Sequence, residues 1–156
     1  MALNSEKQAA ARLRELLERI ASAAGVRATV SVEVREDGLH GYYAGDDVAV
    51  LIGHHGQTID AIQHLAFRIV ARVEGERMPV VVDAGGYRER RAATLRATAD
   101  QAAQAAISEG RAVELEAMSA LERKVIHEHL KGRGDVETYS EGQEPARRLV
   151  VAPVVA

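Results

Sequence analysis

Hydrophobic positions recur with two different spacings along the first part of the chain. Between residues 5 and 24 they follow the i, i+3, i+4, i+7 spacing of one buried helical face. Residues 28–34 then alternate apolar and polar side chains, which predicts a strand with one covered face. The Glu-Asp-Gly segment 36–38 is typical of a hairpin turn, and residues 39–45 are expected to form the return strand. The chain is therefore predicted to begin with a helix and a β-hairpin.

A glycine-bounded turn is predicted to separate the next two helices. Asp46 is expected to cap a short helix that ends at Ile52, and the helical spacing resumes from Ile59 to Val73. The apolar run 79–82 is too short for a helix and is typical of a buried strand. The expected order is therefore helix, strand, strand, helix, helix, strand.

The second part of the chain opens with an alanine-rich helical segment over residues 87–109. Four arginines near its start oppose the helix dipole, so they either have another use or form a solvated face with Glu89 as a partner. They are Arg88, Arg90, Arg91 and Arg96. Ser119 and Glu122 form a capping box that opens a further helix to about Lys131. Strands are expected at residues 111–115, 136–138 and 147–152.

The length of 156 residues suits one ordinary domain or two very small ones, and 47% apolar residues favour a folded chain. The element order predicts an α+β protein of two compact domains, over residues 1–84 and 85–156. Cysteine is absent, which excludes a disulfide framework, a thiolate zinc site and a cysteine nucleophile. No basic segment followed by an apolar run opens the chain, and no stretch reaches the ~20 apolar residues of a membrane-spanning helix. We therefore expect a cytoplasmic protein without membrane insertion.

The charge balance limits what the chain can bind through simple electrostatics. It has 20 basic and 23 acidic residues and a formal net charge of -3, whereas many nucleic-acid-binding domains are strongly basic. The basic residues are not concentrated in one half either, with 9 before Gly85 and 11 after it. Any positive surface must therefore be local, and binding driven by counterion release should have a shallow salt dependence.

The most informative motif is the Gly-His-His-Gly turn at residues 53–56, between two predicted helices. Glycines let a backbone turn tightly and approach a phosphate without an intervening Cβ, and the following helix offers N–H groups and the positive end of its dipole. An aliphatic groove beside such a turn can hold about four unpaired bases. A plain connector between helices is the alternative, but the surrounding element order favours RNA binding. The RNA-binding residues expected here are Ile52, Gly53, His54, His55, Gly56, Gln57 and Thr58.

A second polar cluster lies on the predicted helix that follows Ser119. Arg123 and His127 are four residues apart and so share one helical face, which Lys131 continues. Arginine can hold a phosphate bidentately, and histidine can donate to it or stack on a base. From spacing alone, an exposed polar face opposite apolar residues is the simpler explanation. The phosphate-contacting residues expected in this half are Arg123, Lys124, His127, Lys131, Arg147 and Arg148.

Motifs of enzymes and metal sites are missing from the sequence. His54, His55 and His64 repeat no known ligand spacing. The segment 127–129, His-Glu-His, lacks the i, i+4 histidine pair of a helical zinc site. There is neither a Gly-x-Ser-x-Gly elbow nor a Walker loop. We therefore expect no catalysis, no cofactor and no bound metal.

Taken together, the motifs resemble a known bacterial family. Residues 50–63 resemble the type II KH segment of the Jag (KhpB, SpoIIIJ-associated) family. Arg123 and His127, followed by residues 136–142 and 144–148, resemble the C-terminal Arg-x-x-x-His domain of that family. The order of the motifs along the chain agrees with the family as well.

The resemblance covers residues 28–152, including the segment 86–91 that joins the two domains. It implies a type II KH domain over residues 1–84, an Arg-x-x-x-His domain over residues 85–156, and single-stranded nucleic-acid binding by both. It further implies a role as an RNA chaperone or post-transcriptional regulator, a smaller KH-domain protein as partner, and links to cell-envelope growth and division. Many members have an additional basic domain before the KH domain, and the resemblance does not carry the functions of that domain over to this chain.

The turn departs from the family in its charge. Family members often have a lysine or an arginine there, whereas this chain has His54 and His55. An ordinary histidine has a pKa of about 6.5 and is mostly neutral at neutral pH. We therefore expect RNA binding at this turn to tighten as the pH falls toward about 6.

The predicted function is binding of single-stranded RNA, or of single-stranded DNA, without catalysis. Aromatic residues are only 3% of the chain, so aliphatic packing and arginine stacking must replace base stacking on aromatic rings. The competing hypothesis is a protein-interaction adaptor that uses the same folds and has weak RNA affinity. The acidic balance and the turn without fixed charge slightly favour that alternative.

Overall fold

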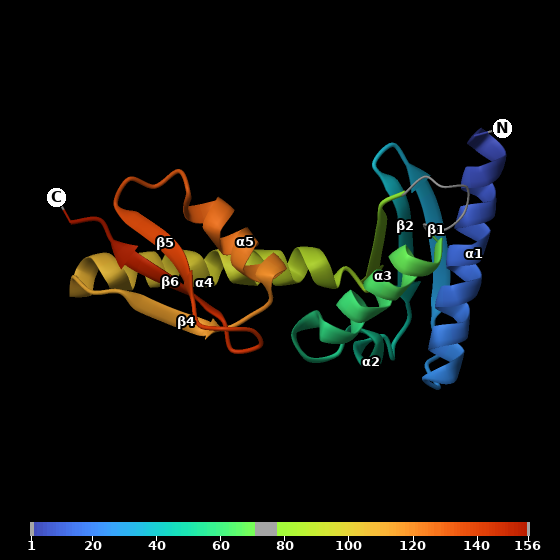
Figure 1. The fold of residues 1–156 in the computed structure, drawn as a ribbon. Helices are drawn as coiled ribbons and strands as arrows, with labels where there is room; N and C mark the ends of the chain where they lie inside the picture. Colours follow the sequence, from blue (N-terminus) through green and yellow to red (C-terminus); the bar gives the residue numbers. More distant parts are fainter. Residues whose placement is uncertain (1, 71–77, 156) are drawn as a thin grey trace. The chain divides into compact units, whose positions relative to one another are not determined.

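The computed structural model describes residues 2–70 and 78–155 (Figure 1). The chain divides into two compact units, Met1–Arg88 and Glu89–Ala156. Helices and strands are mixed in both units, so the predicted α+β class is confirmed. The elements of the first unit are α1 (Ala2–Ala23), β1 (Thr29–Arg35), β2 (Gly38–Ala44), α2 (Ala49–Ile52), the 3-10 turn η1 (His54–Gly56), α3 (Gln57–Val70) and β3 (Val80–Ala84).

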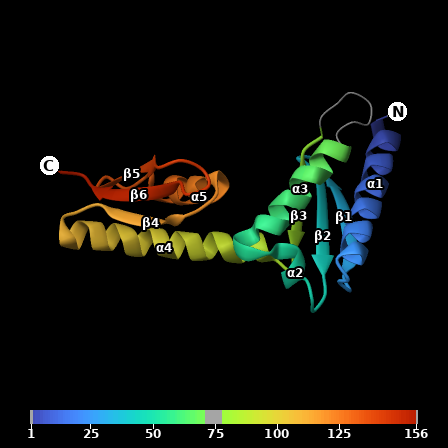
Figure 2. The same ribbon diagram turned by 60° about the horizontal axis from the view of Figure 1, so that its bottom comes forward.

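The sheet of the first unit has the strand order β1-β2-β3, with β1 antiparallel and β3 parallel to β2. Helices α1 and α3 lie side by side along one face of this sheet (Figures 1 and 2). Leu13 and Leu17 of α1 form one core with Ile59 of α3 and Val82 of β3. Gly41 of β2 lies under α1, where a Cβ would come within 2.5 Å of the Leu17 side chain. The absence of a side chain at Gly41 therefore lets α1 approach the sheet closely.

The hydrophobic spacing located these elements correctly, with two exceptions at their ends. The predicted N-cap at Asp46 is wrong, because Val48 occupies the N-cap position of α2 and makes no side-chain cap hydrogen bond. The helix expected to reach Val73 is described as far as Val70, and residues 71–73 lie outside the described residues.

Helix α4 (Tyr87–Glu109) begins with the last two residues of the first unit and continues into the second. The further elements of the second unit are β4 (Val113–Ala117), α5 (Ala120–Leu130), β5 (Val136–Glu141) and β6 (Arg148–Pro153). The strand order is β4-β6-β5, and both pairs are antiparallel. Strand β5 continues to Glu141, well past the predicted end at Thr138.

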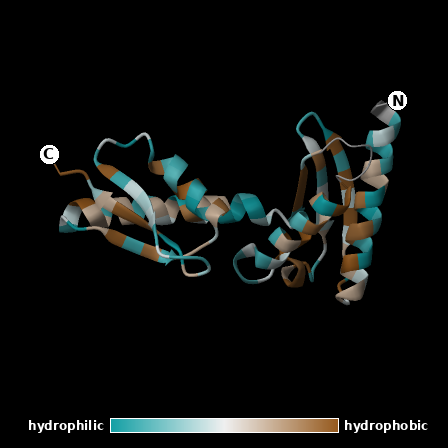
Figure 3. Ribbon diagram, viewed as in Figure 1, coloured by the Kyte–Doolittle hydropathy of each residue, from teal (hydrophilic) through white to brown (hydrophobic). Residues whose placement is uncertain are grey.

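The core of the second unit pairs a small-residue helix face with larger apolar side chains. Ala99, Ala103 and Ala106 of α4 are each 0% exposed and pack in one cluster with Ile126 of α5 and Val151 of β6. Methyl side chains let the α4 backbone lie close to its neighbours. Figure 3 shows brown hydrophobic residues along the strands of the second unit and a teal, hydrophilic start of α4.

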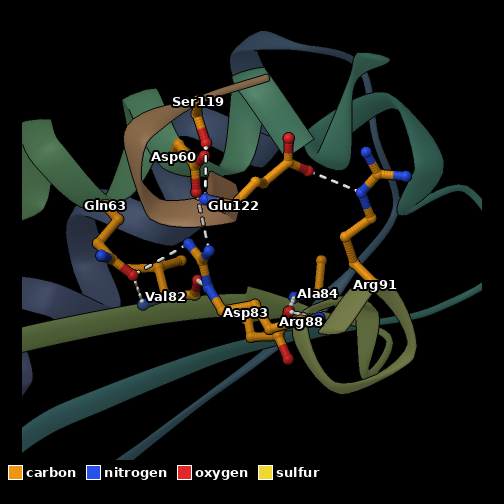
Figure 4. Close-up of polar contacts among 9 residues, drawn as sticks. All are labelled: Asp60, Gln63, Val82, Asp83, Ala84, Arg88, Arg91, Ser119 and Glu122. Carbon is orange, nitrogen blue, oxygen red and sulfur yellow. Dashed lines mark hydrogen bonds and ion pairs between the residues drawn. The ribbon is translucent and has the colours of Figure 1, made fainter. Parts of the chain in front are cut away.

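Arginines near the start of α4 have structural partners. Arg91 donates through Nε to Glu122 Oε1 at 2.7 Å (Figure 4), and Arg96 pairs with Glu89 at 3.0 Å. Glu122 is only 9% exposed, and its backbone N–H donates to Ser119 Oγ at 3.3 Å, as the predicted capping box requires. The charge that opposes the helix dipole is thus partly used to fasten α4 to α5.

Candidate nucleic-acid interface

The turn between α2 and α3 depends on both of its glycines. Gly53 has a φ of 72°, and a Cβ there would collide with the Thr58 side chain. Gly56 is buried with a φ of 77°, and a Cβ there would come within 2.6 Å of the Tyr87 ring. Glycine is therefore required at both positions by backbone conformation and by the space available.

The two histidines form the outer surface of this turn. His54 and His55 are exposed, and their rings stack with centroids 3.9 Å apart. His55 has a φ of 50° and a ψ of 31°, the left-handed conformation that histidine adopts more readily than most residues. Because α3 begins at Gln57, the stacked imidazoles lie next to the positive end of its dipole.

The other predicted residues of the turn differ in exposure. Gln57 and Thr58 are exposed on the first turn of α3. Ile52 is half-buried and packs against the core of the first unit. The structure thus brings the seven predicted residues together in one continuous segment, with only the middle of the turn and the start of α3 facing solvent.

Arg88 links α3, which directly follows the glycine turn in sequence, to the edge strand β3. Its Nε donates to the carbonyl of Val82 at 2.8 Å, and its Nη1 pairs with Asp60 Oδ1 at 2.8 Å. Its Nη2 donates to Gln63 Oε1 at 3.0 Å, and this oxygen also accepts from the Val82 N–H at 3.0 Å (Figure 4). The Arg88 backbone N–H donates to Asp83 Oδ1 at 3.2 Å. These bonds hold the helix that follows the glycine turn.

A pocket between α5 and β5, called here the α5–β5 pocket, collects most of the polar residues predicted in the second unit. Its volume of about 420 Å³ is within the size range of small-ligand sites. Of the predicted residues, Arg123, Lys124, His127 and Arg147 line it. Its other lining residues are Ala120, Thr138, Tyr139, Ser140 and Leu149.

Arg123 is the most buried cation of this pocket. It is 7% exposed. Its Nη1 donates to the Met118 carbonyl at 2.6 Å, and its Nη2 pairs with Glu144 Oε1 at 2.5 Å. The charge of Arg123 is therefore compensated within the protein.

Lys124 and Arg147 carry the uncompensated charge of the pocket. Lys124 is exposed and Arg147 is half-buried, and neither forms an ion pair with any residue of the described ranges 2–70 and 78–155. The Nε atom of Arg147 is buried, and the described part of the chain offers it no hydrogen-bond partner. His127 contacts Thr138 Oγ1 through Nδ1 at 2.6 Å. Two positive groups thus face a pocket that also contains hydroxyls and an imidazole.

Lys131 and Arg148 lie outside the pocket. Lys131 is exposed, with its Nζ 3.9 Å from Glu128. Arg148 pairs with Glu114 of β4 at 2.8 Å. Successive residues of an extended chain point to opposite faces of a sheet, so Arg147 and Arg148 cannot serve the same surface.

The hydroxyl groups of the pocket were not predicted from the sequence. Val136 is 5% exposed and belongs to the core, and Thr138 and Ser140 follow it at a spacing of two. Polar residues at the inward positions of a strand are the signal that could have found them, because inward positions are ordinarily apolar. Asp60, Gln63 and Glu144, the partners of Arg88 and Arg123, were overlooked as well.

No helix in the ranges 2–70 and 78–155 has the length and hydrophobicity needed to cross a membrane. Nor do the side chains of this part of the chain include a group of three or more His, Cys, Asp or Glu able to hold a metal ion.

Two family models match separate parts of the chain, one in each compact unit. The model of the KhpA/KhpB KH domain matches residues 10–82, which contain the glycine turn. The model of the Arg-x-x-x-His (R-three-H) domain matches residues 93–153, which contain the α5–β5 pocket.

Curated relatives match both parts of the chain. A protein named RNA-binding protein KhpB from Lactiplantibacillus plantarum is 45% identical over 66% of the chain and 32% of its own length. Its namesake from Clostridium symbiosum is 35% identical over 88% of the chain and 63% of the relative. The one from Bacillus subtilis is 33% identical over 87% of the chain and 66% of the relative. The chain spans between about a third and two thirds of these relatives.

The resemblance drawn from the sequence motifs is therefore confirmed. Both family models match in the predicted order, and the relatives are matched across most of the chain. The chain belongs to the Jag (KhpB) family, with the glycine turn in its KH domain and the α5–β5 pocket in its Arg-x-x-x-His domain.

Proposed function

We propose that this chain binds single-stranded RNA without catalysing a reaction, through contacts from both units. The observation that carries the proposal is the pair of uncompensated cations, Lys124 and Arg147, in the α5–β5 pocket. The names of the relatives, each an RNA-binding protein KhpB, point the same way.

In the α5–β5 pocket the proposed ligand group is a backbone phosphate. Lys124 and Arg147 would neutralise it, and the hydroxyls of Thr138 and Ser140 and the imidazole of His127 would complete its hydrogen bonds. Such contacts are independent of the base, so this pocket would fix the position of the strand rather than select a sequence.

In the KH domain the proposed contact is made by the backbone of the turn and the start of α3. The two glycines leave room for a phosphate close to the main chain, and the helix terminus favours an anion. His54 and His55 would add charge only when protonated. This contact is expected to be weaker than that of the α5–β5 pocket at neutral pH.

The finer parts of the proposal rest on the family resemblance. They are a cytoplasmic role as an RNA chaperone or post-transcriptional regulator, a smaller KH-domain protein as partner, and links to cell-envelope growth and division. Co-purification of the chain from a bacterial lysate with a smaller KH-domain protein and with bound RNA tests the partner and the ligand. Single-stranded DNA remains an alternative ligand, because neither proposed site has a group committed to the 2′-hydroxyl.

Fluorescence anisotropy with a labelled single-stranded RNA of about ten nucleotides tests RNA binding directly. Arg147→Gln should weaken binding about tenfold, because it removes a charged hydrogen-bond donor to phosphate. Lys131→Gln is the matched control, since it removes the same charge from outside the pocket. If the wild-type chain shows no saturable, salt-sensitive binding, the adaptor hypothesis, which the net charge of -3 favours, replaces RNA binding.

A further inference from the structure

The Arg-x-x-x-His domain is named for an arginine and a histidine, yet its arginine in this chain is almost inaccessible. Arg123 is 7% exposed, and two of its donors already bind the Met118 carbonyl and the Glu144 carboxylate. A phosphate that approached this guanidinium would therefore compete with Glu144.

Hydrogen bonds connect Arg123 and its partner Met118 to the backbone of Arg147. The Arg147 carbonyl accepts from the Met118 N–H at 3.2 Å and, at the limit of hydrogen-bond distance, from Arg123 Nη1 at 3.5 Å. Arg123 and Glu144 thus join the end of β4, the start of α5 and the β5–β6 connection at the point where Arg147 enters the pocket. Arg147 itself has no ion-pair partner in the described chain.

We infer that Arg123 is a positioning residue, which with Glu144 holds Arg147 in place, and that Arg147 makes the phosphate contact. The inference rests on the proposed function, because it assumes that RNA occupies the pocket. Arg123 then fixes the backbone beside the pocket, and Arg147 binds the ligand.

A double-mutant cycle of RNA affinity separates positioning from direct contact, because residues that act through one another give non-additive effects. Arg147→Gln alone should weaken binding about tenfold. Arg123→Lys keeps the charge but loses the forked geometry, and it should weaken binding about fivefold. In the Arg147→Gln background, Arg123→Lys should have no further effect. If the two losses multiply instead, Arg123 contacts the RNA itself and the inference is overturned.

The same cycle with Glu144→Gln guards against a fold defect of the Arg123 variant. It disturbs the Arg123–Glu144 pair from the other side, so it should weaken binding in the wild type and not in Arg147→Gln. Tighter binding of Glu144→Gln would mean that Glu144 competes with RNA for Arg123, which contradicts positioning. Circular dichroism shows that each variant is folded at the temperature of measurement. Failure of the wild-type chain to bind RNA removes the proposed function, and the inference falls with it.

Discussion

The two candidate RNA sites of this chain use opposite means to attract a phosphate. The KH turn offers glycines, a helix terminus and two stacked imidazoles, but no lysine or arginine. The α5–β5 pocket offers Lys124 and Arg147, which have no ion-pair partner in the described residues. In a chain with a net charge of -3, such local differences in pairing decide where an anion can bind.

Each site also has an arginine nearby that binds a backbone carbonyl and a carboxylate within the protein. Arg88 binds Val82 and Asp60 behind the KH turn, and Arg123 binds Met118 and Glu144 beside the α5–β5 pocket. Counting basic residues would assign both arginines to RNA. Their hydrogen bonds indicate that they support the sites instead.

Removing the charge of the α5–β5 pocket should have the largest effect on RNA binding. Changing Lys124 and Arg147 together to Gln should weaken RNA binding about a hundredfold at low salt, since two charged contacts are lost. The slope of log K against log salt should fall by about 0.7, because the two cations are proposed to neutralise one backbone phosphate of a single strand. Anisotropy titrations from about 50 to about 200 mM salt measure both.

Lys131→Gln combined with Arg148→Gln is the matched control for this pair. It removes the same formal charge from outside the pocket. An equal loss of affinity in the control would show that total charge, rather than the pocket, governs binding.

Removing the support behind the KH turn should have the next largest effect. Arg88→Met removes one hydrogen-bond donor from each of Asp60, Gln63 and the Val82 carbonyl, and the free energy of unfolding of the first unit should fall by about 2 kcal/mol after allowance for partial exposure. Hydrogen exchange of α3 amides measures this. Arg96→Met, which breaks an exposed pair on the same helix, should change stability by less than about 0.5 kcal/mol. Equal effects of the two variants would contradict a supporting role for Arg88.

The turn itself should respond to negative charge without a loss of stability. His54→Asp with His55→Asp places two carboxylates where phosphate is expected, and aspartate tolerates the left-handed conformation at residue 55. RNA affinity should fall about fivefold, with unchanged thermal unfolding. Substitution of the glycines is less informative, because a side chain at Gly53 would clash with Thr58 and one at Gly56 with Tyr87. His64→Asp, an exposed change further along α3, serves as the control and should bind nearly as the wild type does.

A change of pH should alter RNA affinity the least. Protonation gives an imidazole a positive charge, so affinity should rise about twofold as the pH falls from about 8 to about 6. His54→Gln with His55→Gln should remove the KH part of this rise, whereas any contribution of His127 in the α5–β5 pocket should remain. A flat pH profile of the wild type would exclude a contribution of histidine charge to binding.

Sequence periodicity predicted most of the fold because the spacing of apolar residues repeats along α1, α3, α5 and the strands. The glycine turn was predictable too, because its position between two helices and its residues are both local features. The prediction of Asp46 as N-cap was wrong because several residues of the same loop could start a short helix. Helix α2 in fact begins after Val48, without a side-chain cap.

The pocket was only partly predictable, for a physical reason. Helical spacing places Arg123 and His127 on one side of α5, but Arg123 is buried and pairs with Glu144, a residue from a distant loop. The end of β5 was missed because Thr138 and Ser140 are polar at inward positions, where they line the pocket instead of the core. Sequence patterns report local periodicity, whereas these features depend on which distant segments meet.

The placement of the tyrosines gives this chain built-in spectroscopic reporters. It has four tyrosines and no tryptophan. The Tyr87 ring lies against Gly56 of the KH turn, and Tyr139 lines the α5–β5 pocket. Tyr43 is 1% exposed and donates to the Leu17 carbonyl at 2.7 Å, so its signal should stay constant. Fluorotyrosine incorporation would therefore allow ¹⁹F NMR to follow occupation of each site separately in one sample, with an internal standard supplied by the fold.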